Sequence, residues 1–192
     1  MTNAKGKDKV RVVSILSNSL INNSWINRLV KQDQVRFKRI EQLIEFLFDH
    51  CLRTGRVLIS EDRSACALVF FRNKKSYSIS LYHSLMLAFK VTGLDRLSQI
   101  LKLERYIKIA HNAVAGEGQI YHIRLWGVHP SFQGKGSGTK LLLEMLEESK
   151  SFGKTLFLET SEKEMLPFYE KIGLKIYHQI DLDGTIYLLK QR

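Results

Sequence analysis

Residues 125–143 read LWGVHPSFQGKGSGTKLLL, and they combine a strand-like segment, a glycine-rich turn and the start of a helix. The apolar residues before the proline are typical of a strand, and the leucines at the end are typical of a buried helix face. Between them, Gly134, Gly136 and Gly138 let the backbone approach a ligand without interference from Cβ atoms. The first N–H groups of the helix have no intrahelical partners and lie at the positive end of its dipole. The stretch therefore predicts a binding site for a phosphate or pyrophosphate.

The spacing of the glycines separates the known kinds of phosphate loop. The Walker pattern G-x-x-x-x-G-K-[ST] does not fit, because Thr139 and Lys140 follow Gly138 in the wrong order. The dinucleotide pattern G-x-G-x-x-G does not fit either, because the three glycines are spaced by two throughout. The pattern that fits is Q-x-x-G-x-G, formed by Gln133, Gly136 and Gly138.

This loop resembles the acetyl-coenzyme A pyrophosphate loop of the GNAT superfamily of N-acetyltransferases. The tripeptide VHP at 128–130 precedes the loop at the family's spacing. A second block, LFLETSEKEMLPFYEKIGL at 156–174, resembles the family's strand, helix and Tyr-Glu-Lys-x-Gly-Phe ending, with Leu174 in place of the usual Phe. The resemblance is specific over residues 119–190 and weaker before them.

The resemblance implies an α/β fold with a mixed, mostly antiparallel sheet of six or seven strands, flanked by helices and splayed at its central strands. The pantetheine arm of acetyl-coenzyme A inserts where the strands splay. No metal ion is expected. The residues implied to bind the coenzyme are Leu125, Trp126, Gly127, Val128, Gln133, Gly134, Lys135, Gly136, Ser137, Gly138 and Thr139.

The implied reaction is N-acetyl transfer by direct attack of an amine on the thioester. No acyl-enzyme is expected, because neither motif block contains a cysteine. Tyr169 occupies the position of the tyrosine that commonly protonates the leaving thiolate in this family, and a phenol is a plausible acid for a thiolate. Ser161 and Glu162 stand where the family often has an asparagine that contacts the coenzyme arm.

The general base has several candidates. Some family members carry a glutamate on the central strand that works through water, and His122 lies near that position here. Histidine titrates near neutral pH, which suits a base. Glu159, Glu117 and an ordered water chain without a side-chain base remain alternatives.

The pattern of apolar residues predicts the other elements. Residues 10–16 (VRVVSIL) are β-branched and apolar, and they predict a first strand. A short helix through 25–30, capped by Ser17 or Asn18, should follow. The remaining expected elements are a helix over 37–51 ended by Gly55, a hairpin of 56–60 with 65–71, a central strand at 119–128, a helix at 139–150, a strand at 155–159, a helix at 162–172 and a hairpin of 175–180 with 185–190.

Residues 78–112 depart from the simplest plan of the family, because they have helical periodicity where strands are usual. We expect an inserted helical pair, which either walls the acceptor pocket or serves only packing. The acceptor pocket should be built from 18–35 and 78–118, whose side chains suit a small amine or a peptide. Its aromatic and histidine residues are Trp25, Tyr77, Tyr82, His83, Tyr106 and His111.

The composition predicts one globular domain over 1–192. No apolar run is long enough to span a bilayer, and Cys51 and Cys66 read as reduced core thiols, so we expect a cytoplasmic monomer or homodimer without membrane contact. The net charge of +11 favours an anionic partner such as the coenzyme, and no nucleic-acid motif is present. The alternative hypotheses are an inactive coenzyme A-binding regulatory module and a basic nucleic-acid-binding protein on the same scaffold.

Overall fold

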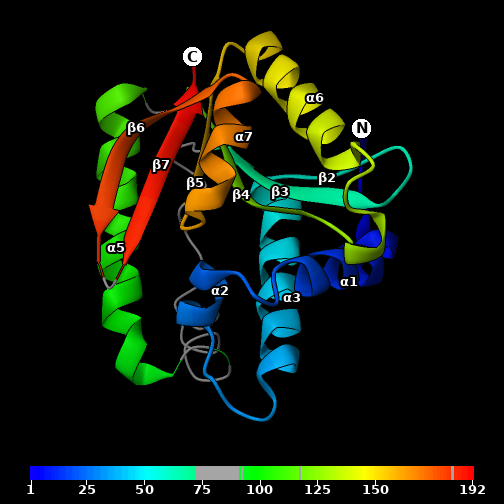
Figure 1. Cartoon of the computed structure of the whole chain (residues 1–192), viewed down its shortest axis with the longest axis vertical. Coiled ribbons are helices and arrows are strands. Elements are labelled where there is room, and N and C mark those ends of the chain that lie inside the picture. Colours follow the sequence, from blue (N-terminus) through cyan, green and yellow to red (C-terminus); the bar gives the residue numbers. More distant parts are fainter. Residues whose placement is uncertain (72–90, 92, 117, 183) are drawn as a thin grey trace.

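A seven-stranded sheet in the order β1-β2-β3-β4-β5-β7-β6 forms the centre of the molecule (Figure 1). The computed structural model describes residues 1–71, 91, 93–116, 118–182 and 184–192. Neighbouring strands are antiparallel except β4 and β5, which are parallel, so the predicted mixed and mostly antiparallel sheet is confirmed. The strands are β1 (Thr2–Asn3), β2 (Gly55–Ile59), β3 (Ala65–Phe71), β4 (Ile120–Val128), β5 (Thr155–Thr160), β6 (Leu174–Asp181) and β7 (Thr185–Gln191).

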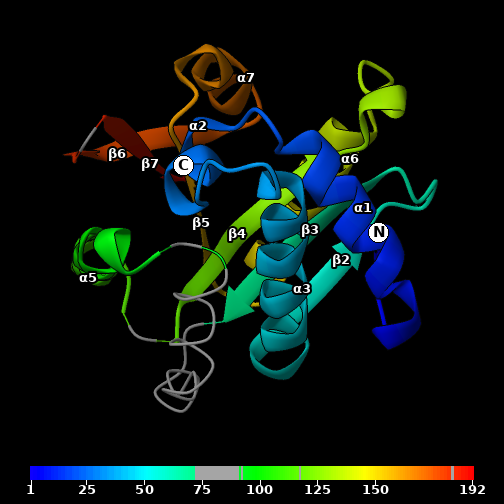
Figure 2. The same ribbon diagram turned by 90° about the horizontal axis from the view of Figure 1, so that it is seen from below.

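Helices cover both faces of this sheet (Figure 2). One face carries α1 (Lys9–Ser19) and α3 (Arg36–Thr54), with α5 (Leu94–Val114) further along beside β6 and β7. The opposite face carries α6 (Ser137–Ser151) and α7 (Leu166–Lys171). The short α2 (Ser24–Leu29) follows α1. Each layer buries its own apolar cluster against the sheet, and together these clusters form the core.

The strand predicted at 10–16 is wrong, because this segment lies within the helix α1. Val12, Val13 and Leu16 are buried against α3 and the sheet, whereas Val10 is 82% exposed. Buried positions at this spacing lie on one face of a helix. Packing of that face has therefore overridden the strand preference of the β-branched residues.

Most of the other predicted elements are confirmed. The helix α3 ends at Gly55, β2 pairs antiparallel with β3, and the C-terminal hairpin is β6–β7. The cap of α2 is Asn23 rather than Ser17 or Asn18: its side-chain oxygen accepts a hydrogen bond from the N–H of Ile26 at 3.0 Å. The expected helix at 162–172 begins as a 3₁₀ turn at Lys163–Met165 and continues as α7.

The second helix of the expected pair is confirmed as α5, which spans 21 residues. The first helix of the expected pair falls on residues 72–90, which lie outside the described residues, as do Tyr77, Tyr82 and His83. The helix α5 lies on the same face of the sheet as α3 but beside β6 and β7 (Figure 2).

Candidate active site

The two parallel strands at the centre of the sheet separate part-way along their length. The register of β4 with β5 runs from Ile120–Thr155 to Ile123–Leu158 and ends there. Beyond this point β4 continues beside β3 up to Val128, and a register shift near Leu68 accompanies the change. This is the splay that the sequence predicted.

A cavity of about 580 Å³ occupies the gap between the separated strands. One wall is the end of β4, and another is the end of β5 with the turn that follows it. Six of the predicted coenzyme-binding residues line the cavity: Leu125, Trp126, Gly127, Val128, Gln133 and Gly134. The other five, residues 135–139, continue from Gly134 into the first turn of α6.

The glycine loop joins this cavity to the N-terminus of α6. Gly134 and Gly136 have φ of +76° and +84°, in the left-handed region that favours glycine. A Cβ atom on Gly138 would lie 2.7 Å from Cγ2 of Val128 and 3.2 Å from the ring of Trp126. The first turn of α6 therefore packs directly against the end of β4, and only glycine fits at position 138.

Side chains of the loop are held by neighbours. The Gln133 amide donates a hydrogen bond to the carbonyl of Val128 at 3.2 Å, and the Ser137 hydroxyl donates to Asp62 at 2.5 Å. Hydrogen bonds from Ser137 and two further serines hold the pKa of the Asp62 carboxyl well below its usual range. The Lys135 ammonium lies 5.1 Å over the ring of Phe132. The first turn of α6 is therefore fixed by the β2–β3 turn.

Tyr169 lies in the wall of the cavity with 4% of its surface exposed. The indole N–H of Trp126 donates a hydrogen bond to its hydroxyl oxygen at 3.0 Å. Burial raises the pKa of Tyr169, although the Trp126 hydrogen bond opposes the shift. The phenol is thus protonated, and because its oxygen accepts from Trp126, its own proton is available to another partner.

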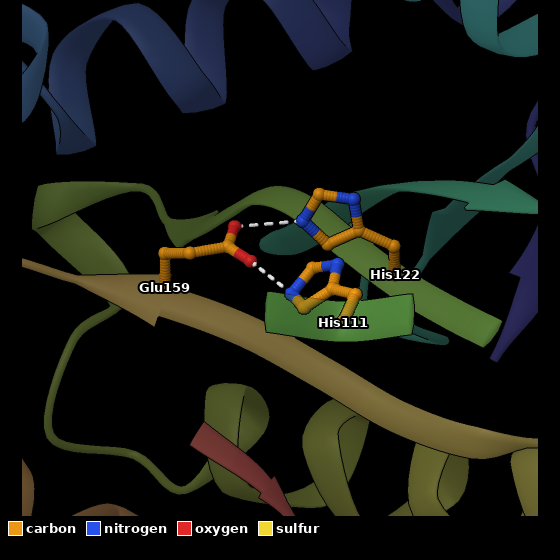
Figure 3. Close-up of side chains that lie close together, drawn as sticks. All are labelled: His111, His122 and Glu159. Atoms are coloured by element: carbon orange, nitrogen blue, oxygen red, sulfur yellow. Dashed lines mark hydrogen bonds and ion pairs between the residues drawn. The ribbon is translucent and has the colours of Figure 1, made fainter. Parts of the chain in front are cut away.

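Two candidates for the base, His122 and Glu159, are brought into direct contact. His122 Nε2 lies 2.7 Å from one carboxylate oxygen of Glu159, and His111 Nε2 of α5 lies 2.8 Å from the other (Figure 3). Glu159 lines the cavity with 11% of its side chain exposed, whereas the two histidines are buried behind it. Glu117, the third candidate, lies outside the described residues.

Glu159 is ionised in this cluster. Burial disfavours the charged carboxylate, but His122 and His111 outweigh burial and hold the pKa of Glu159 well below its ordinary value.

The same cluster resembles a set of metal ligands, because one donor atom from each of His111, His122 and Glu159 lies within 4.8 Å of the others. Ligand atoms around a tetrahedral zinc ion stand about 3.3–3.5 Å apart. The two nitrogen–oxygen contacts of 2.7–2.8 Å are shorter than this spacing. The two histidines therefore contact the carboxylate directly and are not spaced as ligands around a zinc ion.

The opposite side of the cavity is formed by the segment from α1 to α2 and by α5. Its lining includes Asn22, Asn23 and Trp25, together with Ile107 of α5. These residues lie in the segments from which the sequence predicted an acceptor pocket. Of the aromatic residues named there, Trp25 lines the cavity, whereas Tyr106 is 41% exposed and lies outside it.

Glu162, in the turn after β5, joins this side of the cavity to the sheet. Its carboxylate accepts hydrogen bonds from the Ser24 N–H at 2.8 Å and from the Asn23 side chain at 3.2 Å. Both partners belong to the N-terminus of α2. Glu162, one of the two residues expected in place of the family's asparagine, thus anchors α2.

Neither cysteine lines the cavity, and both are buried as free thiols. Burial raises the pKa of the Cys51 thiol to about 12, which keeps it protonated and unreactive.

No helix in the part of the chain that the structure describes is long and apolar enough to cross a membrane.

One functional candidate was missed by sequence reasoning. His111 was named only as a residue that suits the acceptor pocket, and the structure places it against Glu159 instead. It is 48 positions from Glu159 and on an inserted helix, so no local pattern in the sequence connects the two.

Comparison with known proteins agrees with this geometry. Residues 103–174 match the acetyltransferase (GNAT) family. Glucosamine 6-phosphate N-acetyltransferase of Trypanosoma brucei brucei is 40% identical to this chain over 70 residues, which are 35% of this chain and 47% of that protein. The chain thus spans about half the length of this curated relative.

Solved structures share the fold over the whole chain. A protein of Corynebacterium glutamicum described as histone acetyltransferase HPA2 and related acetyltransferase is 13% identical, with a TM-score of 0.70 over 99% of this chain and 93% of its own. Arylalkylamine N-acetyltransferase 2 of Aedes aegypti is 15% identical, with a TM-score of 0.68 over 99% and 96%. The C-terminal condensation domain of Ebony, solved with beta-alanyl-dopamine, is 10% identical, with a TM-score of 0.70 over 99% and 96%.

The fold and the matched segment agree with each other. The overall fold is shared with these structures, and the glycine loop and the block at 156–174 both lie within the segment that matches the family. Residues 103–174 are therefore similar to the GNAT acetyltransferase family, and the whole chain has the fold of these acetyltransferase structures.

Proposed function

We propose that this protein transfers an acetyl group from acetyl-coenzyme A to a primary amine by direct attack on the thioester. The observation that carries the proposal is one cavity in which three parts of such a site meet. The end of β4 leads into the glycine loop, Tyr169 supplies a protonated phenol, and Glu159 supplies a carboxylate backed by His122.

The coenzyme is expected to occupy the gap between the strands. Beyond Ile123, no strand of the described residues pairs with the edge of β4 that faces β5, so this backbone can bond to pantetheine. A backbone N–H there is also placed to stabilise charge on the thioester oxygen. The pyrophosphate would meet the free N–H groups at the start of α6, past Gly136.

The proton chemistry is divided between the two walls. The ammonium of the acceptor gives a proton to the pair of Glu159 and His122, and the neutral amine then attacks the thioester carbon. When the carbon–sulfur bond breaks, the thiolate takes the proton of the Tyr169 hydroxyl. The attacking nitrogen then loses its second proton, which returns through solvent to the Tyr169 phenolate and leaves a neutral amide. The carboxylate faces the cavity and attracts the cationic amine, and the His122 imidazole lies 2.7 Å behind it, within reach of the transferred proton.

The acceptor is expected to enter beside Trp25 and Ile107, opposite the coenzyme. A small amine or the amine of a peptide fits this role. Relatives and structural neighbours are named for glucosamine 6-phosphate and for arylalkylamines, which makes both compounds reasonable first acceptors to assay.

The proposal is tested by measuring release of coenzyme A thiol from acetyl-coenzyme A with a panel of amines: glucosamine 6-phosphate, an arylalkylamine, a polyamine and a short peptide. Glu159→Gln should lower kcat by about 10²–10⁴-fold and leave the Kd of acetyl-coenzyme A unchanged. Glu147→Gln, at an exposed position of α6, is the matched control and should be fully active. If acetyl-coenzyme A binds but no amine promotes thiol release, the protein is a coenzyme-binding regulatory module instead.

A further inference from the structure

We propose that His111, on the inserted helix α5, is a positioning residue that keeps the carboxylate of Glu159 ionised and oriented for the reaction. This inference rests on the proposed function of Glu159 as the carboxylate that receives the acceptor amine. It gives the insertion a part in catalysis in addition to its part in the wall of the cavity.

The geometry places one histidine on each oxygen of Glu159. His122 of β4 is hydrogen-bonded to one oxygen at 2.7 Å, and His111 of α5 lies 2.8 Å from the other (Figure 3). The carboxylate itself comes from β5, so the cluster joins three elements that are distant in the sequence. With a histidine against each oxygen, the carboxylate is held between β4 and α5.

His111 itself has little freedom to move. Its side chain is fully buried, its ring lies 4.6 Å from the ring of Phe157, and its edge-to-face contact with His122 has a centroid distance of 4.9 Å. The contact with Glu159 lacks the alignment of a hydrogen bond, and among the described residues neither ring nitrogen of His111 has a hydrogen-bond partner. A buried imidazole without another polar partner is best explained by its electrostatic contact with the carboxylate.

The carboxylate needs this second histidine because burial alone would neutralise it. Desolvation raises the pKa of Glu159, and the interactions with His122 and His111 lower it by more. The other titratable or charged side chains around the cavity are Arg124 of β4, Glu162 after β5 and Tyr169 of α7, and Tyr177 of β6 contacts the His111 ring. Of these four side chains only Arg124 is a cation, and it forms an ion pair with Glu104 of α5.

Replacement of His111 by an apolar ring therefore has a defined sign. In His111→Phe the desolvation of Glu159 remains and one stabilising interaction is lost, so the carboxylate takes up a proton at higher pH. A protonated carboxylate cannot accept the ammonium proton. The acid limb of kcat/KM against pH should move to higher pH by roughly one unit, with activity recovered above it.

The experiment compares kcat/KM of the acceptor between pH 3 and 8 for four proteins: wild type, His111→Phe, His111→Gln and Leu103→Val. Gln can place a side-chain N–H near the position of Nε2, so its acid limb should lie between those of wild type and His111→Phe. Leu103→Val loosens the packing of α5 two turns away and should leave the acid limb unmoved. The Kd of acetyl-coenzyme A should be the same in all four.

An acid limb in folded His111→Phe that coincides with that of wild type overturns the inference. If His111→Phe does not fold, His111→Asn replaces it: Asn is too short to reach Glu159 as Gln does, so Asn must move the limb further than Gln, and equal profiles overturn the inference. The proposed role of Glu159 as the carboxylate that receives the ammonium proton is tested separately, and it fails when Glu159→Gln keeps full activity. An inactive Glu159→Gln with an unmoved limb in the His111 variants refutes only the role of His111.

Discussion

Trp126 and Tyr169 are joined across the wall of the cavity by a hydrogen bond of 3.0 Å from the indole N–H to the phenol oxygen. The bond connects the end of β4, where the coenzyme is expected, to α7, which follows β5. The ring of Phe168 stacks on Trp126 with a centroid distance of 6.2 Å. These contacts fix the phenol at the point where the two parallel strands have separated.

This geometry predicts the effect of removing the hydroxyl alone. Tyr169→Phe should bind acetyl-coenzyme A normally and lose about 10²–10³-fold in kcat, because the thiolate then leaves without a proton donor. Tyr121→Phe is a matched control: Tyr121 is also buried and donates to Glu148 at 2.6 Å, but it does not line the cavity. Steady-state kinetics with a reactive amine measures both variants. An unchanged kcat in Tyr169→Phe would leave Tyr169 with a packing role.

The glycine loop predicts a second result, in coenzyme binding. Acetyl-coenzyme A at about 100 times its Kd should add about 2.7 kcal/mol to the free energy of unfolding and raise Tm. Gly136→Val should abolish that increase, because Gly136 has φ of +84° and faces open space where the pyrophosphate is expected. Gly153→Val carries the same strain, with φ of +62° and open surroundings, at the other end of α6, so it should lower Tm but keep the full increase with the coenzyme. A full increase in Gly136→Val would place the pyrophosphate elsewhere.

Close approach of α1 to β4 predicts a third result, in stability. A Cβ atom on Gly127 would lie 2.1 Å from Oγ and 2.9 Å from Cβ of Ser19. Gly127→Ala should therefore lower the free energy of unfolding by about 1–3 kcal/mol, the usual cost of overpacking. Ser19→Gly removes both clashing atoms, so the double variant should be more stable than the sum of the two single effects predicts. Urea unfolding of the four proteins measures this, and strict additivity would contradict the close contact.

Local patterns in the sequence were sufficient for much of the fold. The glycine loop, the C-terminal hairpin β6–β7 and the amphipathic helix α3 are each specified by neighbouring residues, and each was predicted correctly in kind. The segment 10–16 was not, because its valines favour a strand locally and only their packing against α3 and the sheet makes them helical. Local propensity is a weak guide where tertiary packing opposes it.

The parts of the candidate site that lie in local motifs were predictable from the sequence, and the parts assembled from separate elements were not. Residues 125–128, residues 133–139 and Tyr169 could be proposed as site residues because they lie within contiguous motifs. The cluster of His111, His122 and Glu159 could not be assembled, because its members come from three elements and the spacing between them carries no periodicity. His122 and Glu159 were both named as bases, but as alternatives, whereas the structure places them 2.7 Å apart.

The same cluster predicts a difference in acid stability. The pKa of Glu159 lies well below its ordinary value of 4.5 in the folded protein, so the unfolded chain takes up this proton first as the pH falls. The stabilisation is complete above about pH 5 and is lost as the pH falls towards the folded pKa. The free energy of unfolding should therefore decrease more steeply below pH 5 in wild type than in Glu159→Gln, which urea unfolding between pH 3 and 7 measures. Parallel curves would show that Glu159 has the same pKa in both states.

The anchoring of α2 by Glu162 predicts an effect on the acceptor alone. Glu162 accepts hydrogen bonds from Ser24 and Asn23 at the start of α2, and the residues around these two positions line the side of the cavity opposite the glycine loop. Glu162→Ala should release this helix and raise the KM of the acceptor by roughly ten-fold, the equivalent of one hydrogen bond to a charged group. The Kd of acetyl-coenzyme A should stay unchanged, because the end of β4 and the loop are held by other contacts. Glu164→Ala, exposed in the same turn, is the control and should alter neither constant. Weakened coenzyme binding with an unaltered acceptor KM would instead assign Glu162 to the coenzyme side of the cavity.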